Sequence, residues 1–202
     1  NSMRRAIGIR IRRSAYSATA RTIDRLIMKF AGINSARDYE AYTWHSNKKL
    51  TVASEELILE ELPLIINHRQ VESSGGIDFI SIRNGEITEH GITIIYKESR
   101  DSLFHVSQAF KAHGIDLPSA QKRASHIKHQ LRIEGNKLLI NPYYSFPSKD
   151  GFRNQEIKVV IEVPRGKKLF INNQEVLVDG KEYEGELYAN EPFESYESYE
   201  SW

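Results

Sequence analysis

The chain of 202 residues is 40% hydrophobic and 27% charged, and it contains no cysteine. This length fits one sizeable domain, or one domain with an appendage, and the composition is ordinary for a globular protein. Because cysteine is absent, disulfide frameworks, thiolate metal sites and thiol nucleophiles are excluded. No run of about 18 apolar residues occurs, so no segment of this sequence is expected to span a bilayer.

Although the net charge is only +1, the two ends of the chain carry strong charges of opposite sign. Residues 1–30 carry eight arginines and lysines against one aspartate, a net charge of +7, whereas residues 182–202 carry seven glutamates and no base. Such ends are typical of solvated or interacting segments that flank a folded centre. We therefore expect a basic N-terminal leader with an amphipathic helix over 1–37, a β-rich domain over 38–188, and an acidic, aromatic, flexible tail over 189–202.

The leader combines a basic segment with a predicted helix. Residues 4–13 place isoleucines at every second position between arginines, which fits an edge strand, a phosphate-binding arm or a juxtamembrane segment that faces anionic lipid. Residues 14–30 place Ile23, Leu26, Ile27 and Phe30 on one helical stripe. We expect this helix to pack on the domain, with a membrane surface as the alternative.

Strand signals dominate from residue 39 onward. The pattern predicts strands at 41–44 and 50–52 around a hairpin loop at 46–49, and strands at 77–82 and 91–96 joined through the turn signal Asn84-Gly85. Further strands are expected near residues 64, 104, 138, 158, 169 and 176. This rhythm indicates an all-β sandwich, barrel or solenoid. Residues 55–67 remain ambiguous, because 55–62 have helical propensity whereas 64–66, after Pro63, look extended.

One internal helix is predicted from Pro118 to Leu131, with Asp116 or Ser119 as its N-cap. His126 and His129 lie three residues apart on it and could be metal ligands. Solvated histidines on a basic helix face are the preferred interpretation, because no further ligand pattern accompanies them. No metal or cofactor is therefore predicted.

Two turn signals and an unusual repeat mark the C-terminal part. Asn172-Asn173 predicts a hairpin over 171–178, and Asp179-Gly180 predicts another turn. The last ten residues repeat Glu-Ser-Tyr, a composition that buries too little apolar surface to offset its ordering entropy. We expect this tail to be flexible, or to fold against a partner with Tyr196, Tyr199 and Trp202 as anchors.

The sequence contains no convincing catalytic constellation. Nucleotide-binding glycine motifs, the His-Glu-x-x-His motif and the Gly-x-Ser-x-Gly elbow do not occur. Asp101, Ser102 and His105 could be assembled into a Ser-His-Asp set on paper. Their closeness in one strand argues against it, because alternate residues of a strand point to opposite faces. We predict that the protein is not an enzyme.

Several short blocks, in order along the chain, resemble a known family. They are Asp101-Ser102-Leu103-Phe104, the helix after Ala112-His113-Gly114, Leu138-Leu139-Ile140-Asn141-Pro142-Tyr143-Tyr144, and Phe152-Arg153-Asn154-Gln155-Glu156-Ile157 leading to Val163-Pro164-Arg165-Gly166. Together they resemble the C-terminal domain of PspC-domain membrane proteins of the Bacteroidetes type over residues 92–172. The resemblance implies a toastrack-type fold of stacked antiparallel strands, solenoid-like or sandwich-like, with one short internal helix. It implies no catalytic residues.

The same resemblance implies a non-enzymatic role in the cell-envelope stress response, sensing or scaffolding through protein contacts, in a membrane-associated protein of which this chain is a fragment. A self-assembling or adhesin-like module is the alternative, and a nucleic-acid-binding protein that uses its basic N-terminus is the third reading. The candidate residues for partner or membrane contact are Arg4, Arg5, Arg10, Arg12, Arg13, Tyr196, Tyr199 and Trp202. Either a protein partner or self-association is expected.

Overall fold

The computed structural model describes residues 41–62, 80–188 and 193–197, except for the side chains of 45–48 and 80–83. All of them belong to the compact unit Asp38–Trp202. The predicted leader helix, its arginines and the strand expected near residue 64 lie outside the described residues. Within the described part of the chain, no helix is long and apolar enough to cross a bilayer.

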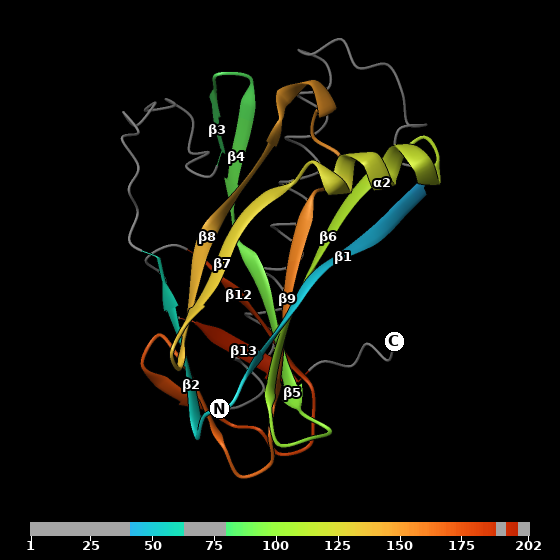
Figure 1. Ribbon diagram of the computed structural model, residues 1–202. Coiled ribbons are helices and arrows are strands. Elements are labelled where there is room, and N and C mark those ends of the chain that lie inside the picture. Colours follow the sequence, from blue (N-terminus) through green and yellow to red (C-terminus); the bar gives the residue numbers. More distant parts are fainter. Residues whose placement is uncertain (1–40, 63–79, 189–192, 198–202) are drawn as a thin grey trace, which may run out of the picture. The chain divides into compact units, whose positions relative to one another are not determined.

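Two β-sheets form the body of the domain (Figure 1). Sheet A contains, from edge to edge, β1 (Ala41–Val52), β6 (Phe104–Gly114), β9 (Glu156–Val163), β5 (Ile92–Glu98), β12 (Tyr183–Leu187) and β13 (Glu194–Glu197). Sheet B contains, in order, β11 (Gln174–Val176), β10 (Lys168–Ile171), β2 (Glu56–Glu61), β8 (Lys137–Pro147), β4 (Glu86–His90) and β3 (Ile80–Arg83), with β7 (Lys128–Glu134) paired to β8. The helix α2 (Leu117–Ser125) lies across one end.

The core lies between the sheets and follows from the period-two pattern of the strands. In β6 every second residue is buried, from Phe104 to Gly114, and the residues between them are half-buried. Leu57 and Leu59 of β2, like Leu138 and Ile140 of β8, are fully buried on the sheet B side. Burying each such side chain stabilises the fold by about 1.5–3 kcal/mol. The predicted fold class, mainly β with one short internal helix, is confirmed.

Strand direction was only partly predictable. Among the described ladders the β5–β9, β2–β8 and β2–β10 pairs are parallel, and the others are antiparallel as expected. Parallel neighbours are brought together by long crossover connections. The local apolar pattern carries no information on that choice.

The predicted hairpin loop at 46–49 is wrong. Residues 41–52 form one continuous edge strand, β1, whose register against β6 shifts between Asn47 and Leu50. A β-bulge accommodates the polar residues there without ending the strand. The Asn84-Gly85 turn is present, with φ angles of 51° and 78°, but it joins β3 to β4 rather than to residues 91–96.

The predicted helix is shorter than expected. It ends at Ser125, and residues 128–134 form β7 instead. The cap prediction is confirmed, because the Asp116 carboxylate accepts a hydrogen bond of 2.8 Å from the backbone N–H of Ser119. Ala120 and Ala124 are the buried residues of α2. The alternating side chains of β7 mimic a helical stripe over one turn, which explains the error.

Pro142 lies where β8 changes its partner. Residues 137–140 of β8 pair with β2, and residues 143–147 pair with β4. Because β7 runs along the other edge of β8, β2 and β4 must share one edge. Proline has no N–H to donate, so it fits the gap between them.

The expected tail contributes a strand to sheet A. Glu194–Glu197 form β13 next to β12, and Phe193 is only 8% exposed. The Tyr96 hydroxyl lies 2.7 Å from the Ser195 hydroxyl, and Lys181 donates to Glu197. A Cβ on Gly185 would lie 2.5 Å from the Glu194 carbonyl oxygen, so glycine permits this close approach. A flexible tail from residue 189 onward therefore does not describe residues 193–197.

Candidate functional site

An array of aromatic and cationic side chains covers part of the outer face of sheet A, near one of its edges. Tyr42 and Trp44 are two residues apart on β1 and thus share a face. The register places Tyr42 opposite His113 and Trp44 opposite Lys111. The rings of Tyr42 and His113 lie 5.4 Å apart, and Tyr42 is 58% exposed. We call Tyr42, Trp44, Lys111, His113 and Lys158 the aromatic face.

Lysines connect the rings of this face. The Lys111 amine lies 5.2 Å from the centroid of the Tyr42 ring and 5.4 Å from that of Trp44. The Lys158 amine lies 5.0 Å from the Trp44 ring. Lys111 also pairs with Glu156 at 3.0 Å. Cation–π contacts of this kind contribute about 0.5–1 kcal/mol each at exposed sites and fix the orientation of the rings.

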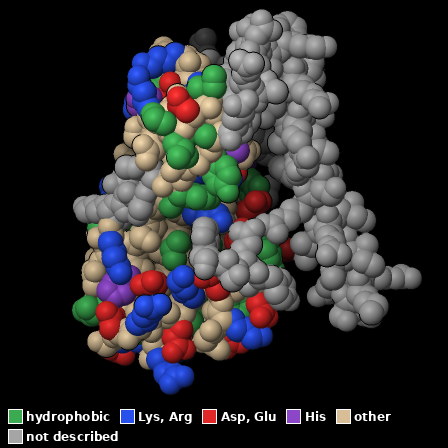
Figure 2. Space-filling view, turned by 90° about the vertical axis from the view of Figure 1, so that its right-hand side faces the viewer, with side chains coloured by type: hydrophobic (Ala, Val, Ile, Leu, Met, Phe, Trp, Pro, Cys, Tyr) green, Lys and Arg blue, Asp and Glu red, His purple; other side chains and the backbone are tan. Residues whose placement is uncertain are grey.

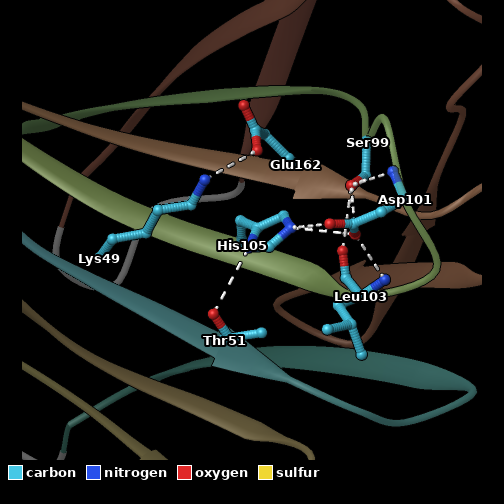
Figure 3. Close-up of polar contacts among 7 residues, drawn as sticks. All are labelled: Lys49, Thr51, Ser99, Asp101, Leu103, His105 and Glu162. Atoms are coloured by element: carbon cyan, nitrogen blue, oxygen red, sulfur yellow. Dashed lines mark hydrogen bonds and ion pairs between the residues drawn. The ribbon is translucent and has the colours of Figure 1, made fainter.

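A second cluster surrounds His105 at the start of β6 (Figure 3). His105 Nε2 lies 3.0 and 2.9 Å from the two carboxylate oxygens of Asp101. Asp101 also accepts from the backbone N–H of Leu103 at 2.8 Å and from the Ser99 hydroxyl at 3.3 Å. The Leu103 N–H, then His105, lower the pKa of Asp101. The cluster thus holds the turn between β5 and β6.

The cluster differs from the Ser-His-Asp set of Asp101, Ser102 and His105 that the sequence suggested. Asp101 and His105 do meet, because residues 99–103 form a turn in which strand alternation does not apply, so that argument against their contact was wrong. The nearby serine is Ser99, and Ser102 is exposed. On the other side, Thr51 Oγ1 lies 3.4 Å from His105 Nδ1, beyond the usual range of about 2.6–3.2 Å between nucleophile and base. This geometry suits a turn support better than a nucleophile.

A third cluster lies between the sheets. Gln108 is the polar residue among the inward side chains of β6, and its amide donates to His129 Nδ1 at 2.7 Å. His129 Nε2 donates to the Asn141 carbonyl oxygen at 2.7 Å. Burial lowers the pKa of His129 to about 4, so the ring is neutral near pH 7. Gln108 is buried, whereas His129 and Asn141 are half-buried beside it. We call Gln108, His129 and the Asn141 carbonyl the buried chain.

The histidine pair on the predicted helix is divided between two environments. His126 follows the end of α2 and pairs with Asp150 at 2.7 Å, and His129 lies inside the buried chain. The expectation of two solvated histidines on one helix face is therefore wrong. In the described ranges, no group of three or more potential ligands could hold a metal ion.

Gln155 stabilises the loop before β9. Its side chain accepts from the backbone N–H of Arg153 at 2.8 Å and donates to the Gly151 carbonyl oxygen at 2.7 Å. The neighbouring Glu156 pairs with Lys111. Both ends of the Gln155 amide therefore bond the loop before β9 rather than a ligand.

Only one of the predicted contact residues lies within the described ranges. Tyr196 is half-buried in β13, and its hydroxyl donates to Glu184 at 3.3 Å. The five arginines of the leader, together with Tyr199 and Trp202, lie outside. The aromatic face was missed, although Tyr42 and Trp44 at period two within an uncharged strand were a usable signal.

Charge on the described surface is mixed. Figure 2 shows lysine, arginine and acidic side chains interspersed at one end of the visible face, and hydrophobic side chains gathered nearer its middle. A nucleic-acid-binding surface would concentrate positive charge.

The comparisons place the chain in a family. A family model described as "ToastRack found in some PspC" matches residues 82–200. The match begins within β3, covers both sheets from there and extends through β13, further than the resemblance noted over residues 92–172. No curated protein and no solved structure matches the chain.

Proposed function

We propose, from the premise that the chain belongs to the ToastRack family found in some PspC proteins, that it is a non-enzymatic domain of a membrane-associated protein of the cell-envelope stress response. It senses or scaffolds through contacts with other proteins. The family match carries this proposal. The stress role and the membrane association are inferred from the PspC proteins that the family description names.

Two features of the described residues support a role in contact. The aromatic face presents Tyr42 and Trp44 at the edge of sheet A, and aromatic residues are enriched where proteins bind one another. The histidine–carboxylate pair at His105, which has hydroxyls nearby, supports a turn. Binding therefore fits the surface better than turnover does.

Self-assembly is the second candidate, and one observation favours it. Sheet A ends in β1 on one side and β13 on the other among the described strands. Unpaired strand edges are templates for pairing with a further copy. A strictly monomeric protein at high concentration, measured by light scattering, would exclude this candidate.

The proposal is tested in the organism that encodes the chain. The full gene is expected to encode transmembrane helices beside this domain, and the tagged protein to sediment with membranes. Deleting the codons of residues 41–202 is expected to abolish induction of an envelope-stress reporter by a membrane-perturbing detergent. A strain that lacks the domain and responds normally would contradict the proposal, as would a full-length protein found in the soluble fraction.

A further inference from the structure

The edge of β1 that no other described strand covers supports an inference about how the domain binds its partner, and this inference rests on the proposed function. The hydrogen bonds of His113 determine which way the β1 backbone groups point. The His113 N–H donates to the Arg153 carbonyl oxygen at 2.8 Å, and the His113 carbonyl accepts from Arg123 at 3.1 Å. Both backbone groups of His113 therefore bond outside β1, although Tyr42 is its register partner.

In an antiparallel ladder, a residue pair that does not exchange hydrogen bonds points its N–H and C=O groups away from one another. Tyr42 thus directs both groups to the free edge of sheet A. The alternation of the ladder assigns the same direction to Trp44 and Ser46, and directs Thr43 toward β6. No backbone hydrogen bond between described residues satisfies these outward groups.

Among the described residues, the first half of this edge lacks several of the usual protections, although α2 contacts β1. Natural edge strands are shielded by charges, prolines, bulges, short length or a covering helix or loop. Residues 41–46 are uncharged, contain no proline and include Tyr, Thr and Trp, which favour strands. The bulge between Asn47 and Leu50, with Lys48 and Lys49 within it, interrupts the edge only beyond Ser46. The open segment thus offers the outward backbone groups of three residues.

The side chains beside this segment indicate what kind of strand it accepts. Tyr42 and Trp44 lie on the outer face next to Lys111 and Lys158. A strand added along β1 would place its own outward side chains directly opposite the two rings. Aromatic side chains would stack there. The lysines already have contacts of their own, because Lys111 pairs with Glu156 and Lys158 is buried.

We propose that residues 41–46 of β1 bind an extended, aromatic-containing segment of a partner protein by adding it as a further strand of sheet A. The added backbone supplies the affinity, and the aromatic face selects the sequence. The bulge limits the added strand to the first half of β1.

A synthetic peptide with the sequence of Phe193 to Trp202 serves as the probe, because it contains one phenylalanine, two tyrosines and a tryptophan. Amide hydrogen exchange of the full chain is measured with and without it. The Tyr42, Trp44 and Ser46 amides are expected to exchange at least tenfold more slowly with the peptide, and the Thr43 amide to change little. A peptide with its four aromatic residues replaced by alanine is expected to bind at least tenfold more weakly.

Ser46→Pro removes one outward N–H but no hydrogen bond to β6, and Ser46→Ala is its matched control. The proline variant is expected to lose peptide binding and the alanine variant to keep it, with unchanged thermal unfolding of both. Absence of protection in the wild-type chain at millimolar peptide, or protection away from β1, would overturn the proposal. If the same amides are protected without peptide, and more strongly at higher protein concentration, the strand that adds to β1 comes from a second copy of the chain. That result would overturn the proposal of a separate partner. Neither result affects the stress-reporter experiment, so failure of the strand-addition proposal can be distinguished from failure of the proposed function.

Discussion

His105 and His129 are both half-buried, but they contact different surroundings, and comparing them separates a contact on the outer face of sheet A from one between the two sheets. His105 lies on the outer face of sheet A and contacts the exposed carboxylate of Asp101. His129 lies between the sheets and contacts only neutral groups, the Gln108 amide and the Asn141 carbonyl. The same side chain supports a local turn in one case and joins two sheets in the other.

The difference shows where polar groups matter most for stability. A polar group that is buried must keep its partners, because water cannot replace them, whereas an exposed group can exchange its partner for water. The buried chain is complete: each nitrogen of His129 has one partner, in the tautomer that carries its proton on Nε2. We therefore expect substitutions in the buried chain to have much larger effects than those at His105.

The largest expected effect is that of His129→Ala. It leaves the Asn141 carbonyl and the Gln108 amide without their partners in the interior, and it also opens a cavity. We expect the free energy of unfolding to fall by about 4 kcal/mol. Urea unfolding followed by tryptophan fluorescence measures this, and His105→Ala serves as the control. Equal losses of unfolding free energy in His129→Ala and His105→Ala would contradict the larger structural role assigned to His129.

Acid is expected to act through His129 as well. The folded pKa of about 4 lies below the unfolded value of about 6.5, so between these pH values the unfolded chain binds a proton that the folded chain does not. Stability that is fully present above pH of about 6.5 is thus lost as pH falls toward 4, by about 3 kcal/mol. Urea unfolding at a series of pH values measures the loss. In His129→Gln, which keeps a neutral donor, this part of the loss should disappear; an unchanged pH profile would refute the assignment.

Gln108→Leu is expected to have a smaller effect. It leaves His129 Nδ1 without its donor but adds apolar contacts to the core, so the net loss is about 1–2 kcal/mol. Gln108→Glu sharpens the comparison, because a carboxylate beside the ring would raise the pKa of His129. NMR titration of the His129 ring protons measures that shift. A downward shift would contradict the described contact.

Asp101→Asn is expected to have the smallest effect. The amide oxygen can still accept from the Leu103 N–H, and the site is open to water. We expect a small decrease in Tm that disappears below the pKa of Asp101, where the wild-type carboxyl group is neutral too. Thermal unfolding at pH 7 and pH 2.5 tests this. A loss as large as that of His129→Ala would mean that the exposed cluster is structurally essential.

Local chemistry predicted the features that depend on a few neighbouring residues. Asn172-Asn173 adopts φ angles of 48° and 63° between β10 and β11, as a hairpin turn requires, and Asp116 caps α2. Features that depend on distant partners were missed. β13 is polar and repetitive, and its Ser195 lies against Tyr96, which is 99 residues away in the chain and which local sequence does not connect to it.

The sites were predictable to a smaller extent. Asp101 and His105 were identified together, but their contact depends on a turn whose Ser-x-Asp start, Ser99-Arg100-Asp101, was not used as a signal. His129 was assigned to a helix surface because the end of α2 could not be located from the pattern. The open edge of β1 follows from sheet order, which only the fold reveals.

The claim that this domain works by contact and not by turnover is tested most directly by two single-residue strains assayed with the same envelope-stress reporter. Ser46→Pro blocks the edge of β1 and leaves the His105 cluster intact, whereas His105→Ala does the reverse. The account predicts that the Ser46→Pro strain fails to respond and that the His105→Ala strain responds like wild type. A silent His105→Ala strain beside a responsive Ser46→Pro strain, with both proteins folded and present at wild-type levels, would contradict it.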